Sequence, residues 1–115
     1  MKRNGFTLPE IILVTLVIAI VSALAYGMYQ NVVNDQRGRT CSANLRTIEA
    51  AKTAWVHDHP GQDITSVNEL LPYLKTGVLP TCPSGGTYSN LTDRRQLARC
   101  SLYNPSKPWA HAVNP

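Results

Sequence analysis

The sequence predicts an α+β fold in which one long N-terminal helix packs against a small C-terminal helix and a β-hairpin. Two observations predict the long helix: Asp, Glu, Lys and Arg are absent between Ile11 and Tyr29, and no proline occurs between Glu10 and Pro60. A turn punctuated by proline and glycine leads to a short strand at residues 86–90, and a second strand at residues 99–103 is expected to pair with it as a hairpin. With 115 residues, the chain has room for one small domain.

The long helix is expected from about Phe6 to about His57, and its first part is uniformly apolar. The ten Ile, Leu and Val side chains between Ile11 and Leu24 together favour membrane insertion by about 3–6 kcal/mol. A charge at mid-bilayer costs roughly 2.5–3.5 kcal/mol, and Glu10 lies at the edge of the segment where the cost is smaller. We therefore expect residues 6–30 to form a transmembrane helix.

The second part of the helix is amphipathic. An apolar stripe recurs near the three- and four-residue spacing of a helix, and it comprises Val33, Cys41, Leu45, Ile48 and Trp55. Most charged residues fall off this stripe, and the stem of Lys52 fills it. The same helix should therefore become the spine of a small globular domain, residues 31–115, with Gly27 and Gly38 as its weak points.

A second, short helix is expected after Pro60 and Gly61 end the first. Ser66 and Glu69 form the pattern of a capping box. Gly77 marks the end of this helix, and Pro72 should shorten or kink it. Its apolar residues are expected to cover the Leu45, Ile48 and Trp55 part of the apolar stripe.

Lys2 and Arg3 precede the apolar segment, which predicts a cytoplasmic N-terminus and a globular domain on the outer side of the membrane. The alternative is a secretory signal peptide cleaved after Ala25, which would release a soluble domain, because residues 23–25 read Ala-Leu-Ala. The interposed stretch "FTLPE" argues against it, since an acid and a proline serve no purpose in the apolar core of a signal peptide.

The stretch "GFTLPE" resembles the start of type IV pilins and of the pseudopilins of type II secretion systems. Gly5, Phe6 and Glu10 match that family's motif at the required spacing. The resemblance implies a leader of residues 1–5 and cleavage between Gly5 and Phe6 by a prepilin peptidase. It also implies methylation of the new Phe6 amino group and polymerisation through the N-terminal helices.

Physical chemistry is consistent with these roles. Pro9 lies in the first helical turn, where its missing N–H needs no partner. Glu10 lies near the positive end of the helix dipole, and an unpaired carboxylate among apolar helices is costly. An ammonium on Phe6, from the same or a neighbouring subunit, would relieve that cost and set the register. The alternative is that Glu10 only marks the membrane edge.

"CPSGGTY" followed by another Cys resembles a subgroup of bacterial pilin-like proteins that carry Cys-Pro-x-Gly-Gly-x-Tyr after the long helix. This resemblance, together with hairpin geometry and an oxidising outer compartment, predicts a disulfide between Cys82 and Cys100. Cys41 is expected to be a buried thiol.

No metal and no other cofactor is expected. A zinc site formed by the three cysteines with His57 or His59 is disfavoured because the chain lacks a Cys-x-x-Cys spacing. "HDH", residues 57–59, reads as a solvated helix end rather than a metal site. Asp93 alone does not make a calcium loop.

The chain carries a formal net charge of +4, which is too modest to indicate nucleic-acid binding by itself. Its one basic cluster comprises Arg94, Arg95 and Arg99. This cluster is either a solvated loop or, as an alternative, a patch that contacts DNA phosphates in a competence pilus. No nucleophile elbow, phosphate loop or pair of catalytic carboxylates is found, so no enzymatic activity is expected.

These features predict a structural subunit of a type IV pilus or a type II secretion pseudopilus, with the pseudopilus favoured because the domain is small. The expected partners are the prepilin peptidase, other pilin-like subunits, an inner-membrane assembly platform and membrane lipid, with nucleic acid an unlikely partner. The subunit is expected to span the inner membrane once and then to enter an extracytoplasmic filament. A DNA-binding competence pilin and a secreted soluble domain are the alternatives.

Overall fold

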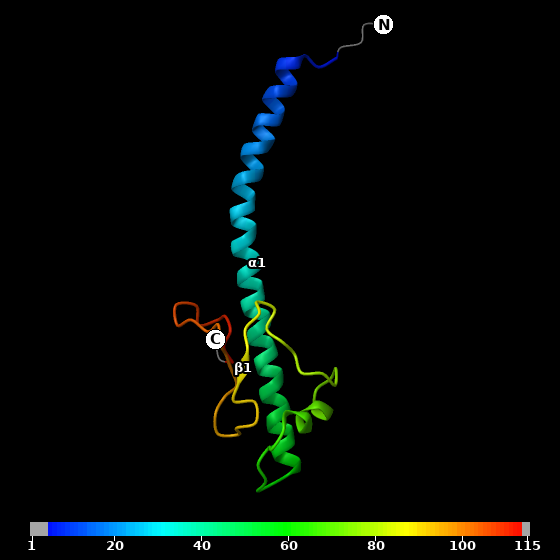
Figure 1. Ribbon diagram of the computed structural model, residues 1–115, viewed down its shortest axis with the longest axis vertical. Helices are drawn as coiled ribbons and strands as arrows, with labels where there is room; N and C mark the ends of the chain where they lie inside the picture. The colour runs from blue at the N-terminus through cyan, green and yellow to red at the C-terminus, as the bar shows by residue number, and fades with distance from the viewer. Residues whose placement is uncertain (1–4, 114–115) are drawn as a thin grey trace. The chain divides into compact units, whose positions relative to one another are not determined.

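The computed structural model describes residues 5–113 and confirms the α+β class with a long N-terminal helix. Its elements are the helix α1 (Leu8–Asp58), the 3-10 helix η1 (Val67–Tyr73) and the strands β1 (Tyr88–Ser89) and β2 (Arg99–Cys100) (Figure 1). The chain divides into two compact units, Met1–Val33 and Asn34–Pro115. Lys2 and Arg3, on which the predicted orientation depends, lie outside the described residues.

The helix α1 begins with Pro9 in its first turn, where a proline is tolerated. The backbone N–H of Thr7 donates a hydrogen bond to Oε2 of Glu10 at 3.1 Å, and the backbone N–H of Ile11 donates to the Thr7 carbonyl at 3.2 Å. The carboxylate thus satisfies a backbone donor at the helix start, as in a capping box. The helix ends at Asp58, just before Pro60 and a left-handed Gly61.

In the first unit, α1 presents its apolar side chains to the outside on every face. Ile12, Leu16 and Ile20, for example, are each more than half exposed. By length and composition, this helix could cross a membrane, although a signal sequence near the N-terminus would meet the same test. A helix that is apolar all round is stable only when lipid or other apolar helices cover it.

In the second unit, the segments after Asp58 return alongside the part of α1 from residue 34 onward (Figure 1). They form two core clusters against it. One contains Cys41, Leu45, Ile48, Cys82, Ala98 and Cys100. The other contains Trp55, Ile64 and Leu70.

The short helix therefore covers less of the apolar stripe than expected. Leu70 of η1 packs against Trp55, whereas Leu45 and Ile48 are covered by the hairpin region and the C-terminal segment. Pro72 explains the difference, because it has no N–H to continue a helix and η1 spans only seven residues. Such a short helix cannot also cover the part of the apolar stripe that contains Cys41, Leu45 and Ile48.

The cap of η1 also differs from the predicted capping box. The Ser66 hydroxyl accepts a hydrogen bond from the backbone N–H of Asn68 at 3.3 Å, not from that of Glu69. The Glu69 carboxylate instead accepts a hydrogen bond from the Thr65 hydroxyl. A cap side chain can accept from the backbone N–H two or three positions after it, and here Ser66 uses the nearer of the two.

The hairpin is present but shorter than expected. β1 and β2 pair antiparallel, with Tyr88 opposite Cys100 and Ser89 opposite Arg99. Asn90 takes a left-handed conformation, with φ 60°, and ends β1, while a turn from Cys100 to Tyr103 ends β2. This register carries Cys100 into the buried face of the hairpin.

Gly38 is a docking point for the C-terminal segment, and α1 continues through it without interruption. A Cβ at this position would lie 2.7 Å from Cβ of Ala110, and the backbone N–H of His111 donates a hydrogen bond to the Gly38 carbonyl at 3.1 Å. Gly38 was expected only to weaken the helix. In the structure, its lack of a side chain also permits this close contact with Ala110.

Gly38→Ala is expected to destabilise the second unit. Alanine gains up to about 1 kcal/mol of helix propensity, but overpacking against Ala110 costs about 1–3 kcal/mol. Urea unfolding of the full chain in detergent micelles, followed by tryptophan fluorescence, measures the net effect. Gly27→Ala is the matched control, because a Cβ there meets nothing within 4 Å. A Gly38→Ala chain more stable than the parent would contradict the role of Gly38 as a close contact.

Candidate functional site

The predicted processing segment lies immediately before α1. Gly5, Phe6 and Thr7 have no regular secondary structure, and Phe6 is 84% exposed. A Cβ at Gly5 would meet nothing within 4 Å. The Gly5–Phe6 peptide bond is therefore accessible in a non-helical segment, as a proteolytic site requires.

Glu10 lies in the first turn of α1 and is exposed, with its carboxylate bonded to the Thr7 backbone N–H. This contact is local to one chain. The pairing of Glu10 with an ammonium on Phe6 stays a prediction.

Four side chains with metal-binding or redox chemistry converge in the second unit. Cys41 comes from α1, Cys82 from the turn before β1, Cys100 from β2, and His111 from the C-terminal segment. Their sulfur and ring-nitrogen atoms all lie within 4.8 Å of one another. We call these four residues the thiol cluster.

All three cysteines are free and buried in the structure. The predicted Cys82–Cys100 disulfide is therefore not formed here, although the two sulfurs are neighbours, and it stays a prediction. Cys41 is fully buried, as expected. Sequence reasoning missed His111, because it lies eleven residues beyond Cys100 without a recognisable spacing, and a turn of the C-terminal segment brings it back to α1.

The environment of the three thiols differs from one to the next. Burial raises the pKa of Cys41 far above its usual range, and it also raises the pKa of Cys100. Burial acts to raise the pKa of Cys82 as well, but hydrogen bonds from the backbone N–H groups of Ser84 and Gly86 and from the neighbouring thiols lower it overall. Cys82 is thus the thiol whose ionised form the protein favours most.

His111 contacts two of these sulfurs through one ring nitrogen. Its Nδ1 lies 3.6 Å from Sγ of Cys82 and 3.5 Å from Sγ of Cys100. Burial lowers the pKa of the imidazole below its usual value, so the ring is neutral near pH 7. A neutral imidazole can offer its lone pair to a proton or to a metal ion.

The N-terminal segment matches a known family. Residues 1–26 match the family model described as the prokaryotic N-terminal methylation motif. The chain thus has the N-terminal segment of a type IV pilin-like protein. No curated protein and no solved structure matches the chain significantly.

The motif implies processing by a prepilin peptidase and assembly with pilin-like subunits. The motif and the long apolar helix fit a protein anchored in the inner membrane. The match ends before "CPSGGTY", so membership of the subgroup with that motif stays a prediction.

The basic cluster formed by Arg94, Arg95 and Arg99 is partly engaged in internal contacts. Nε of Arg94 lies 3.0 Å from Oδ1 of Asp63, and its Nη1 donates a hydrogen bond to the Gln62 carbonyl at 3.2 Å. These contacts tie the hairpin loop to the segment after α1. Arg95 and Arg99 are exposed, and contact of the three arginines with DNA stays an untested alternative.

The two histidines at the end of α1 lie apart from the thiol cluster. The His57 side chain is 88% exposed, and its Nδ1 lies 3.3 Å from Oδ1 of Asp58. His59 stacks on Trp55 with ring centroids 4.5 Å apart. These contacts agree with the reading of "HDH" as a helix end.

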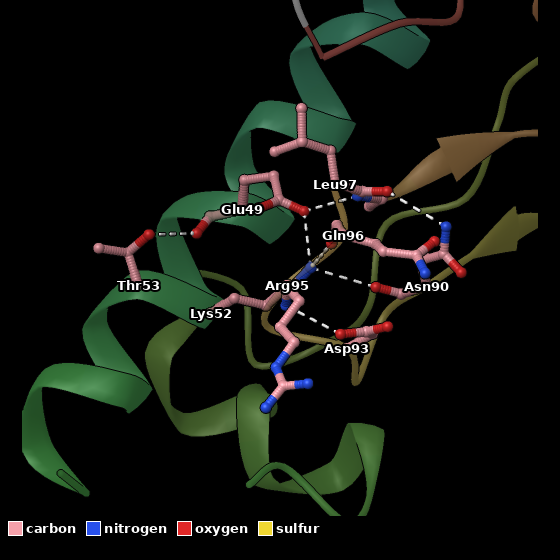
Figure 2. A network of polar contacts seen from close by, with 9 residues as sticks. Glu49, Lys52, Thr53, Asn90, Asp93, Arg95, Gln96 and Leu97 are labelled. Atoms are coloured by element: carbon pink, nitrogen blue, oxygen red, sulfur yellow. Dashed lines mark hydrogen bonds and ion pairs between the residues drawn. The ribbon is translucent and has the colours of Figure 1, made fainter. Parts of the chain in front are cut away.

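A buried ion pair is the second feature that sequence reasoning missed. Lys52 is only 3% exposed, and its Nζ donates hydrogen bonds to Oε1 of Glu49 at 2.8 Å and to the carbonyls of Asn90 and Gln96 at 3.1 and 2.8 Å (Figure 2). Oε1 of Glu49 also accepts a hydrogen bond from the Ala98 backbone N–H at 2.7 Å. Glu49 was expected off the apolar stripe, yet with Lys52 it holds the hairpin loop on α1.

Proposed function

We propose that the protein is a structural subunit of a type IV pilus or a type II secretion pseudopilus, without catalytic activity of its own. In this proposal a prepilin peptidase cleaves between Gly5 and Phe6 and methylates the Phe6 amino group. Residues 1–5 are then the leader, residues 6–30 the transmembrane and polymerisation helix, and residues 31–115 the globular domain.

The observation that carries the proposal is the methylation motif at residues 1–26, followed directly by an apolar helix with outward-facing side chains. Apolar side chains on every face suit both lipid before assembly and neighbouring helices after it. The proposed partners are accordingly other pilin-like subunits, an inner-membrane assembly platform and lipid. The small second unit, with a two-stranded sheet of two-residue strands, favours a pseudopilus over a pilus.

The mature N-terminus tests the proposal directly. Intact-mass and N-terminal analysis of the protein, produced with a prepilin peptidase, is expected to give a chain that starts at an N-methylated Phe6. A chain that starts at Tyr26 would establish signal-peptide cleavage instead. An intact N-terminus in the presence of an active peptidase would also contradict the proposal.

Gly5→Leu supplies the matched variant for this measurement. A side chain at Gly5 points into open space, so the substitution is not expected to disturb the fold. It adds bulk only next to the proposed scissile bond, where the leader ends in glycine in the family that the chain resembles. We expect the variant to stay in the membrane fraction uncleaved, whereas Gly27→Ala should be processed normally.

A further inference from the structure

We propose that Cys41, Cys82, Cys100 and His111 bind one zinc ion that holds the hairpin and the C-terminal segment on α1. This proposal departs from the expectation of no metal site and from the predicted Cys82–Cys100 disulfide. It goes beyond the proposed function, and its test does not depend on processing or assembly.

The size of the thiol cluster fits a tetrahedral zinc site with three sulfurs and one nitrogen. Zinc binds thiolate sulfur at about 2.3 Å and imidazole nitrogen at about 2.0–2.1 Å, which places ligand sulfur and nitrogen about 3.6 Å apart in a tetrahedron. The two distances from His111 Nδ1 to sulfur are 3.6 and 3.5 Å. All four ligand atoms lie within 4.8 Å of one another, so they can surround one common centre.

Hydrogen bonding alone explains this arrangement poorly. A neutral imidazole nitrogen has one lone pair, or one N–H, and can make one good hydrogen bond. Nδ1 of His111 nevertheless lies at nearly equal distances from Cys82 and Cys100. A nitrogen atom that lies at nearly the same distance from two sulfur atoms is the arrangement expected when all three atoms are ligands of one metal ion.

Hydrogen-bond donors surround the three sulfurs, as they do in thiolate metal sites. The backbone of Ser84 and Gly86 acts to lower the pKa of Cys82, and that of Leu102 acts to lower the pKa of Cys100. Tyr88 packs against the core cluster that contains Cys41, and its hydroxyl acts to lower the pKa of that thiol. The amide of Asn44 in turn donates to the Tyr88 hydroxyl at 3.4 Å and to the Thr81 carbonyl at 3.0 Å.

Hydrogen-bond donors near the sulfurs suit a metal site that carries a negative charge. Zinc binding converts three thiols to thiolates and releases three protons to solvent, so the ion, three thiolates and a neutral imidazole carry a net charge of −1. The N–H and O–H groups directed at the sulfurs spread that charge. They orient the ligands in the same way that partners outside the coordination sphere do in other zinc sites.

The "CPSGGTY" stretch acquires a role at four positions. Cys82 supplies a ligand, and Gly85 makes the turn after it with a φ of 84°. Gly86 lies so close to Cys100 that a Cβ there would be 2.7 Å from its sulfur. Tyr88 packs against the core cluster that contains Cys41. Each feature places or supports a sulfur of the cluster.

The backbone also fixes His111 over the three cysteines. His111 has a φ of 57°, a left-handed conformation that is unfavourable for a residue with a side chain and is found preferentially at functional sites. Its N–H is held by the Gly38 carbonyl. The Ser42 hydroxyl donates to the Trp109 carbonyl at 3.0 Å and accepts from the Ala112 N–H at 3.1 Å, so it clamps the chain on both sides of His111.

The test uses the full chain, purified in detergent micelles without oxygen. Elemental analysis is expected to find one zinc per chain, and the three thiols should react with a thiol reagent only after a chelator removes the metal. Cobalt added to the chelated protein should give the intense visible absorption and the sulfur-to-cobalt charge-transfer band of a tetrahedral thiolate site. These measurements need no variant and so do not depend on the folding of one.

Variants then assign the ligands. Cys82→Ser and His111→Ala should each weaken zinc binding by at least about tenfold in competition with a chromogenic chelator. Tyr88→Phe, which removes the hydroxyl that acts on Cys41 together with its contact with Asn44, should weaken it by roughly tenfold. His57→Ala is the matched control and should leave the affinity unchanged, because His57 is exposed and lies outside the thiol cluster.

Three results would overturn the proposal. A metal-free native protein with a Cys82–Cys100 disulfide, found by mass spectrometry without reduction, would establish the covalent link instead. A bound metal other than zinc would refute the assignment of the ion. Zinc affinity unchanged in both Cys82→Ser and His111→Ala would show that zinc binds elsewhere.

Discussion

Lys52→Ala is expected to lower the free energy of unfolding of the second unit by about 3 kcal/mol or more. The Lys52 ammonium is buried and makes three hydrogen bonds, to the Glu49 carboxylate and to two loop carbonyls. Removing it leaves a largely buried negative charge without its counter-ion, and two carbonyls without the donor that Lys52 supplies. The Glu49 side chain remains 19% exposed, which keeps the estimate at the lower end of the range for broken buried pairs.

Urea unfolding of the full chain in micelles, followed by tryptophan fluorescence, measures this loss. Lys75→Ala is the matched control, because Lys75 is exposed, and it should change stability by less than about 0.5 kcal/mol. Lys52→Met combined with Glu49→Gln removes both charges and should cost less than Lys52→Ala. If Lys52→Ala were no more destabilising than Lys75→Ala, the network in Figure 2 would have no role in holding the loop.

Glu10→Val is expected to abolish filament assembly and to leave membrane insertion intact. In the proposed subunit, the carboxylate pairs with the Phe6 ammonium of the same or a neighbouring chain and sets the register of apolar helices that otherwise slide freely. Valine favours insertion, so the defect should appear only at assembly. The measurement is the yield of sheared filaments in a host that lacks the parent subunit, together with membrane fractionation.

Glu10→Gln distinguishes the role of the negative charge from the role of Glu10 in capping the helix. Glutamine keeps an oxygen that can accept the hydrogen bond from the Thr7 N–H, but it has no negative charge. If charge pairing drives assembly, both variants fail to form filaments. Normal assembly of Glu10→Gln would assign Glu10 to capping, and normal yield of Glu10→Val would show that neither role matters.

Much of the fold could be predicted from local sequence. The absence of proline and of charge predicts a long helix with an apolar first part, and α1 runs from Leu8 to Asp58. Turn residues predict the hairpin near its observed position, although the strands are shorter. The spacing of Gly5, Phe6 and Glu10 indicates the family that the match over residues 1–26 supports. Each of these signals lies within one stretch of chain.

The candidate metal site could be predicted only in part. The hairpin pattern places Cys82 near Cys100, and the apolar stripe places Cys41 in the core. Nothing local to His111 connects it with residues 41 and 82, because its place follows from a contact between Ala110 and Gly38 that spans more than seventy residues. The burial of Lys52 could not be predicted for the same reason. The position of a lysine on a helix does not indicate which loop carbonyls will accept its hydrogen bonds.

The sequence by itself determined the long helix, its apolar first part and the motif for processing, because helix formation and membrane insertion depend on the composition and period of a continuous segment. Only the tertiary structure decided that three cysteines and His111 meet at one point and that Lys52 and Glu49 fasten the loop. Those contacts join segments distant along the chain, and they form because the small core can bury its apolar stripe only by folding the hairpin and the C-terminal segment back onto α1.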